Sequence, residues 1–170
     1  MKIFYSPIGY FKTPFTDIKG MPIQPVGADG IEGSIEILSE YRDGLKDLAD
    51  FSHVFVLYHL HEIEGYDLMV KPFLDNEHHG IFATRSPKRP NPIGLSVMRL
   101  KGVTDNLVLL EGIDVLDRTP VIDIKPYVAD FDCCDADRFG WFEGKSANAK
   151  HHRSDERFAA RQGKEEGVSS

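Results

Sequence analysis

The sequence predicts a mainly β fold, a small single-domain β-barrel with short helices and a polar C-terminal helix or tail. Short apolar or alternating runs broken by Gly and Pro dominate the chain, and long helical periodicity is scarce. Short links join the successive runs, which favours a sheet that curls or closes on itself over alternating strands and helices. A chain of 170 residues suits one domain with a real core and leaves little room for a second.

The expected elements follow in chain order. In residues 31–37 isoleucines stand at alternate positions, so they share one face of a sheet. A short helix is expected over residues 43–51, where apolar residues recur at helical spacing. Asp105 and Asn106 supply a turn that pairs the flanking runs antiparallel. Strands are expected over residues 3–11, 31–37, 53–60, 80–85, 93–100, 107–113 and 121–124.

The composition changes near the C-terminus. Residues 1–145 are expected to form the barrel domain, and residues 146–170 a polar extension that is partly helical or mobile. No apolar run approaches the roughly 18 residues of a membrane span, and the first residues lack the order of a signal peptide. We therefore expect a soluble cytoplasmic protein with no membrane partner. Cys133 and Cys134 are adjacent and are expected to be reduced thiols.

The charge is unevenly distributed. A net charge of −7 argues against a nucleic-acid partner, because phosphate binding needs a positive surface. However, no acidic residue lies between Glu77 and Asp105, and this window holds Arg85, Lys88, Arg89, Arg99 and Lys101. One part of the molecule is therefore expected to be locally basic, although an ordinary solvated loop would show the same charges.

Several common kinds of site are disfavoured. The glycines of residues 27–33 have the wrong spacing for a dinucleotide-binding turn and precede a β-like run instead of a helix. No P-loop, nucleophile elbow or catalytic-cysteine signature is present. His59 and His61 would project from the same face of a strand, but no further ligand stands at a familiar spacing. We therefore expect no metal site.

A rigid, cationic loop is the first informative stretch. Prolines 87, 90 and 92 fix their own φ and keep the preceding residues extended, so residues 85–92 have little entropy to lose on binding. Arginine suits bidentate recognition of carboxylate or phosphate, and Asn91 offers a donor and an acceptor to a base edge. Lys88, Arg89 and Asn91 are therefore candidate contacts to a phosphate, a carboxylate or a base edge.

The second informative stretch, residues 114–127, gathers polar groups at the end of a strand. It contains Asp117, Asp123, Lys125 and Tyr127, and strand alternation places Asp123 and Lys125 on one face. Such a group suits acid–base chemistry. A surface ion pair at a strand end is the alternative.

Together these stretches resemble the TrmO or TsaA-like family. The chain reads GIFATRSPKRPNPIGLS and then DVLDRTPVIDIKPY, and lesser similarities extend the resemblance over about residues 3–130. The resemblance implies a β-barrel methyltransferase unlike the Rossmann type, with S-adenosyl-L-methionine bound near a homodimer interface. The implied reaction methylates N6 of adenine 37 in a tRNA that already bears a threonylcarbamoyl group there.

The resemblance also implies a set of cofactor contacts. Arg118 stands where the family usually has glycine, and Ile23 replaces a common arginine. The chain is shorter than family members that carry an additional C-terminal domain. By matching positions, the implied cofactor contacts are Pro22, Ile23, Gln24, His61, Glu62, Arg85, Leu95, Val115, Leu116, Asp117 and Arg118.

Methyl transfer from a sulfonium is an in-line displacement, so the protein mainly has to align the reacting atoms. Asp117 and Asp123 are the candidate general bases for the poorly nucleophilic N6, with Lys125 and Tyr127 as positioning partners. Arg85 would pair with the cofactor carboxylate or with an RNA phosphate, and Lys88, Arg89 and Asn91 would contact the tRNA. Two alternatives stay open: a non-catalytic module that binds S-adenosylmethionine or RNA, and, ranked last, a metal-dependent hydrolase.

Overall fold

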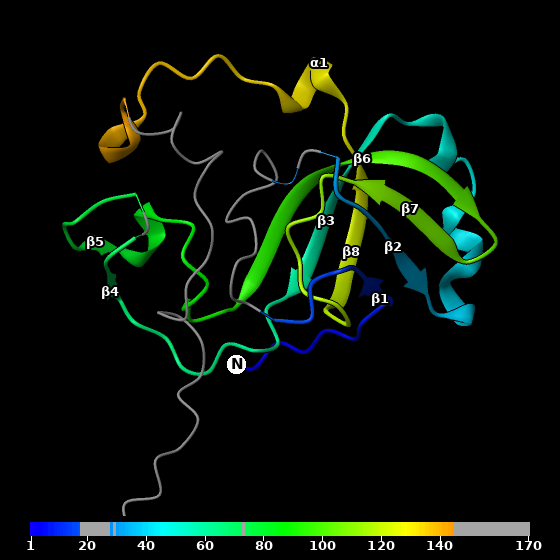
Figure 1. The fold of residues 1–170 in the computed structure, drawn as a ribbon, viewed down its shortest axis with the longest axis horizontal. Coiled ribbons are helices and arrows are strands. Elements are labelled where there is room, and N and C mark those ends of the chain that lie inside the picture. Colours follow the sequence, from blue (N-terminus) through cyan, green and yellow to red (C-terminus); the bar gives the residue numbers. More distant parts are fainter. Residues whose placement is uncertain (18–27, 29, 73, 145–170) are drawn as a thin grey trace, which may run out of the picture.

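The structure confirms the mainly β fold. It is a computed structural model that describes residues 1–17, 28, 30–72 and 74–144. The main sheet closes into a barrel in the order β1-β2-β7-β6-β3-β8, and β4 pairs with β5 in a separate two-stranded sheet (Figure 1). The strands are β1 (Gly9–Lys12), β2 (Glu32–Ile37), β3 (His53–His59), β4 (Met69–Val70), β5 (His79–Gly80), β6 (Ile93–Thr104), β7 (Leu107–Glu111) and β8 (Pro120–Pro126).

The helices of the described residues are short. They are the 3-10 helices η2 (Ser39–Leu45), η3 (Leu48–Asp50), η4 (Ile81–Ala83) and η5 (Gly140–Phe142), and the α-helix α1 (Ala129–Asp132). The helix expected over residues 43–51 forms as η2 and η3, because Asp47 between them has a left-handed φ of 64°. Among the residues described, none of the helices is long and apolar enough to cross a bilayer.

Two strand predictions need correction. The first strand begins only at Gly9, and a strand over residues 80–85 is wrong because η4 follows β5 directly. The Thr84 hydroxyl donates to the Ile81 carbonyl oxygen at 2.9 Å, and the Arg89 guanidinium donates to the carbonyl oxygens of both residues. The side chains therefore take the acceptors that a neighbouring strand would need. The end of the barrel domain and the polar extension lie outside the described residues.

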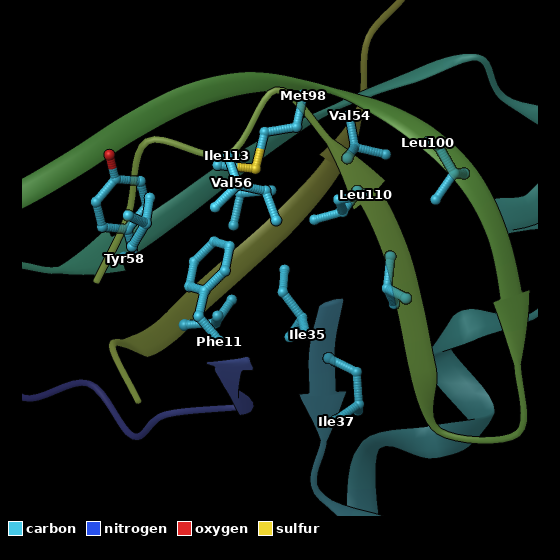
Figure 2. Close-up of a cluster of buried hydrophobic side chains, with 13 residues drawn as sticks. Phe11, Ile35, Ile37, Val54, Val56, Tyr58, Met98, Leu100, Leu110 and Ile113 are labelled. Carbon is cyan, nitrogen blue, oxygen red and sulfur yellow. The ribbon is translucent and has the colours of Figure 1, made fainter. Parts of the chain in front are cut away.

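The barrel interior is filled by alternate residues of its strands. In β3 the side chains of Val54, Val56 and Tyr58 point inward, and Met98 and Leu100 of β6 meet them (Figure 2). Full burial of one such aliphatic side chain contributes about 1.5–3 kcal/mol. The alternation that predicted strands is thus also the source of the core.

The hairpin between β6 and β7 confirms the predicted turn. Asp105 has a positive φ of 58°, and the Asn106 side chain donates to the Ile37 carbonyl oxygen at 3.0 Å. The register of the pair shifts between Leu100 and Gly102. Because a bulge bends a strand, the long β6 can curve around the barrel (Figure 1).

Residues 127–144 form a segment, the C-terminal strap, that leaves β8 and reaches the β4–β5 sheet (Figure 1). The Trp141 ring stacks on His79 with centroids 4.5 Å apart, and its Nε1 donates to the Ala83 carbonyl oxygen at 2.8 Å. The other side of this contact is fixed by Asp75, whose Oδ2 lies 3.2 Å from His79 Nε2. The strap thus ties the small sheet to the chain that follows the barrel.

Candidate functional site

The loop between η4 and β6 is held by an arginine within it. Arg89 Nη1 donates to the carbonyl oxygens of Ile81 at 3.2 Å and Thr84 at 2.8 Å. Its guanidinium carbon lies 6.0 Å from the ring centroid of Phe82, and Phe82 is 77% exposed. The loop is therefore stiffened by hydrogen bonds as well as by proline, and part of the Arg89 guanidinium is occupied within the protein.

The basic residues of the window do not form one patch. Lys88 Nζ lies 3.8 Å from Asp67 Oδ2, whereas Asn91 is exposed. Lys101 lies further along β6, where its Nζ is 3.1 Å from Glu111 Oε2. Only the part of the window near the proline loop can therefore contribute to a cationic site at the end of the barrel.

Residues 114–119 form a turn that is attached to the N-terminal segment. Asp117 Oδ1 accepts a hydrogen bond from the Thr13 amide at 3.0 Å, and the Thr13 hydroxyl donates to the Val115 carbonyl oxygen at 2.9 Å. The Asp117 amide donates to the Phe15 carbonyl oxygen at 2.7 Å. Pro22, Ile23 and Gln24, the first implied cofactor contacts, lie outside the described residues.

Arg118 stands in a turn position that suits glycine. Its φ is 62°, and its amide donates to the Phe11 carbonyl oxygen at 2.8 Å. A left-handed backbone costs a residue with a Cβ roughly 1–2 kcal/mol. The glycine that the family resemblance implies at this position thus has a conformational reason, and Arg118 adopts the same left-handed backbone at that cost.

His61 lies against the same turn. Its Nδ1 is 3.3 Å from the Thr119 hydroxyl, and its Nε2 is 3.3 Å from Glu62 Oε1. Thr119 is only 2% exposed, so this hydrogen bond fixes one side of the imidazole from within the fold. The loop after β3 and the turn before β8 therefore meet.

Asp114 is a member of this site that the sequence reasoning missed. The Ser96 hydroxyl donates to Asp114 Oδ1 at 2.9 Å, and the Tyr58 hydroxyl lies 3.0 Å from Ser96 Oγ. Burial raises the pKa of Asp114 to about 6, while the Ser96 hydrogen bond and the Arg85 charge act in the opposite direction. In the sequence, Asp114 is marked only by its position at the start of the second motif, and this position does not indicate whether its side chain is buried.

Gly94 of the proline-rich motif makes room for Tyr58. A Cβ on Gly94 would lie 2.7 Å from Tyr58 Cδ2 and closer still to Cε2 and Cζ. Figure 2 shows the Tyr58 ring at the edge of the core cluster, with its hydroxyl directed away from the other labelled side chains. The glycine therefore allows a buried tyrosine to reach Ser96 and, through it, Asp114.

These contacts define a barrel-end cluster, which comprises His61, Glu62, Arg85, Asp114 and the turn of residues 115–119. Thr119 joins His61 to the turn, and the Leu60 amide donates to the Pro92 carbonyl oxygen at 2.8 Å, which joins the loop after β3 to the proline loop. The proline loop and the second motif are thus close enough in space to serve one site.

The remaining candidate residues lie on the outer face of the barrel. Leu57 of β3 pairs with both Leu95 of β6 and Asp123 of β8, so these side chains share a row. Asp123 Oδ2 lies 2.6 Å from Lys125 Nζ, which is the surface ion pair that the sequence left as the alternative. The Tyr127 ring packs edge-on to a β3 aromatic ring on the same face. The functional roles assigned to Leu95, Asp123, Lys125 and Tyr127 stay predictions.

An open cavity of about 530 Å³ adjoins the turn from the side of β1 and β2. Its walls include two implied cofactor contacts, Asp117 and Arg118. In the part of the chain that the structure describes, no three His, Cys, Asp or Glu side chains are grouped as metal ligands. The cavity is lined by Tyr10, Phe11, Lys12, Thr13, Pro14, Glu32, Glu36, Asp117 and Arg118.

Comparisons with known proteins agree with this picture. The family described as tRNA-methyltransferase O N-terminal domain matches residues 10–133. A probable S-adenosyl-L-methionine-binding protein of Pyrococcus abyssi is 44% identical over 158 residues, which cover 93% of this chain and 86% of that protein. A tRNA (adenine(37)-N6)-methyltransferase of Mus musculus is 38% identical over 134 residues, which cover 75% of this chain and 31% of that protein.

The fold is also found in a solved relative. The crystal structure of TrmO from Pseudomonas aeruginosa superposes with a TM-score of 0.70 at 38% identity, covering 83% of this chain and 63% of that chain. The chain thus spans less than two thirds of both the mouse and the Pseudomonas relatives. The expected cofactor and methyltransferase class agree with the names of these relatives. Since the family match covers most of the sequence and the barrel agrees, this chain belongs to the family of the tRNA-methyltransferase O N-terminal domain.

Proposed function

We propose that this protein is an S-adenosyl-L-methionine-dependent methyltransferase that methylates N6 of adenine 37 in tRNA, in the cytoplasm. The observation that carries the proposal is the barrel-end cluster, where the loop of His61 meets both the 114–119 turn and the proline loop, which carries Arg85. Family membership supports the same reaction, because a relative with 38% identity is named for it.

The described residues fit this cofactor by charge. S-adenosylmethionine, when bound, supplies an electrophilic methyl group on a sulfonium. The Arg85 guanidinium suits its carboxylate, and the carboxylate of Asp117 suits its cationic groups. His61, held by Thr119, belongs to the same cluster. The cluster therefore binds and orients, which is the main demand of an in-line displacement.

The proposed RNA contacts lie beside this cluster. Asn91 is exposed and Lys88 is partly exposed in the proline loop. Arg89, although bonded to carbonyl oxygens through Nη1, would contribute positive charge to a phosphate. We further propose that the substrate adenine carries a threonylcarbamoyl group, as the family resemblance implies.

A homodimer is part of the proposal, with the cofactor site near the interface. The middle of the outer face of β3 and β6 is apolar and is formed by Phe55, Leu57, Ile93, Leu95 and Val97, whereas His53 pairs with Arg99 at one end of the face. Leu95 is 60% exposed, which is unusual for a large aliphatic side chain on a sheet face. Covering this face with a second copy would bury it and would place Leu95, an implied cofactor contact, at the interface.

A non-catalytic module that binds S-adenosylmethionine is the second candidate. It is favoured by the name of the Pyrococcus abyssi relative, which describes binding alone. Binding and turnover would use the same cluster, and a measurement of methyl transfer distinguishes them.

The experiment uses the full chain with tritiated S-adenosylmethionine. Calorimetry measures cofactor binding, and filter capture measures label transferred to tRNA from cells that lack their own enzyme for this methylation. Parallel reactions use tRNA with and without the threonylcarbamoyl group, and tRNA whose position 37 is not adenine. Transfer that requires adenine 37 supports the proposal, whereas binding without transfer to any tRNA favours the module.

A further inference from the structure

The carboxylate of Asp114 is held by a directed chain of hydroxyl groups. Ser96 donates its one hydroxyl proton to Asp114 Oδ1 at 2.9 Å, so Tyr58, 3.0 Å away, must donate to Ser96 Oγ. Burial, and secondarily the charge of Asp114, raise the pKa of Tyr58 above its usual value, which keeps the phenol protonated as a donor. The chain therefore begins in the core, runs through β3 and β6, and ends on the carboxylate.

The charged and ionisable groups around Asp114 come from three directions. Tyr58 reaches it from β3 through Ser96 of β6, and Arg85 acts on it from the proline loop. Residues 115–119 continue directly from Asp114 into the turn that holds His61. Asp114 thus lies within the barrel-end cluster and is oriented from the core side.

The other two candidate bases are engaged differently. Asp123 faces away from the barrel interior. Its Oδ1 accepts a hydrogen bond from the Ile124 amide, and its Oδ2 forms an ion pair with Lys125. Asp117 uses Oδ1 to hold the Thr13 amide, so it maintains the turn. Asp123 is thus engaged in a surface ion pair and Asp117 in holding the N-terminal segment, whereas Asp114 is held by hydroxyl groups that come from the core strands.

We propose that Asp114 is the catalytic residue that accepts the N6 proton during methyl transfer, and that Ser96 and Tyr58 are its positioning residues. This inference rests on the proposed function. The N6 lone pair forms a bond to the methyl carbon of the sulfonium donor, the carbon–sulfur bond breaks, and its electron pair stays on sulfur as a neutral thioether. The proton lost from N6 passes to the Asp114 carboxylate, which returns it to solvent after product release.

The pH dependence of single turnover tests this role. Asp114 must be charged to act, and because burial holds its pKa at about 6, the wild-type rate should fall as the pH drops through about 6. Asp114→Asn should lower the rate at neutral pH by about 100-fold or more and remove this acidic limb. Ser96→Ala removes a hydrogen bond that lowers the pKa of Asp114, so the limb should move to higher pH.

The controls separate this inference from the proposed function. Asp50→Asn changes an exposed carboxylate at the end of η3 and should leave rate and pH profile unchanged. Folding and cofactor binding are checked for each variant. If Asp114→Asn does not fold, the role of Asp114 is tested by whether Ser96→Ala shifts the acidic limb of the pH–rate profile to higher pH. An active wild type with an Asp114→Asn variant of equal rate, or with an unmoved limb in Ser96→Ala, overturns the role of Asp114 alone. A wild type that transfers no methyl group overturns both proposals.

Discussion

Replacing Gly94 by alanine should destabilise the protein although the change adds only a methyl group. The new Cβ would lie 2.7 Å from Tyr58 Cδ2 and closer to the rest of that ring edge. Carbon atoms pack at about 3.5–4.0 Å, so the ring would have to move by roughly 1 Å or more. It has little room, because it packs edge-on to Phe11 with centroids 5.7 Å apart and its hydroxyl is bonded to Ser96.

The magnitude follows from three contributions. Overpacking a core typically costs about 1–3 kcal/mol. Loss of the hydrogen bond between Tyr58 and Ser96 costs about 1 kcal/mol more. Alanine has less conformational entropy than glycine in the unfolded chain, and this difference offsets about 0.4–1 kcal/mol of the destabilisation. The expected net loss in the free energy of unfolding is about 2 kcal/mol, or a fall in Tm of roughly 4–8 °C for a chain of this length.

Urea unfolding followed by circular dichroism measures this change. Gly44→Ala is the matched control, since a Cβ there meets nothing within 4 Å, and it should be neutral or slightly stabilising. Gly94→Ala in a Tyr58→Leu background should lose most of its cost, because the ring is gone. A Gly94→Ala variant as stable as the wild type would show that the Tyr58 ring is not confined between Gly94, Phe11 and Ser96.

Three further predictions concern the turn, the strap and the outer face. Arg118→Gly should stabilise by about 0.5–1 kcal/mol, because relief of a positive φ outweighs the entropy cost of glycine; unchanged or lower stability on urea unfolding would contradict this. Trp141→Ala removes the His79 stack and the hydrogen bond to Ala83, so limited proteolysis should cut faster between β4 and β5 while the Tm of the barrel hardly moves. Val97→Glu places a charge on the apolar outer face and should weaken a dimer at least about tenfold in sedimentation equilibrium, and a dimer of unchanged affinity would place the interface elsewhere.

Local sequence patterns predicted most of the barrel. The alternating isoleucines of residues 31–37 did mark a strand, with Ile35 and Ile37 buried inside. The turn at Asp105 and Asn106 did join an antiparallel pair. These features were predictable because side-chain alternation and turn preference depend on neighbouring residues.

Elements governed by side-chain hydrogen bonds or by a single unusual backbone angle were not predicted correctly. Residues 80–85 have a β-like composition, but hydrogen bonds from Arg89 and Thr84 keep Ile81–Ala83 in a 3-10 helix. The short helix expected near Leu45 and Leu48 is divided at Asp47 by a left-handed residue. Propensity alone does not report such hydrogen bonds or such backbone angles.

The sequence by itself determined the family, the barrel and the two segments that hold the candidate site, because long motifs and alternation are properties of neighbouring residues. It also placed Asp123 and Lys125 on one face, and the ion pair agrees. Only the tertiary structure separated Asp123 from Asp114, one on the outer face and one in the barrel-end cluster with a pKa raised to about 6. The physical reason is that burial and the hydrogen bond from Ser96 arise where β6 meets the segment after β7, a contact between residues 18 positions apart.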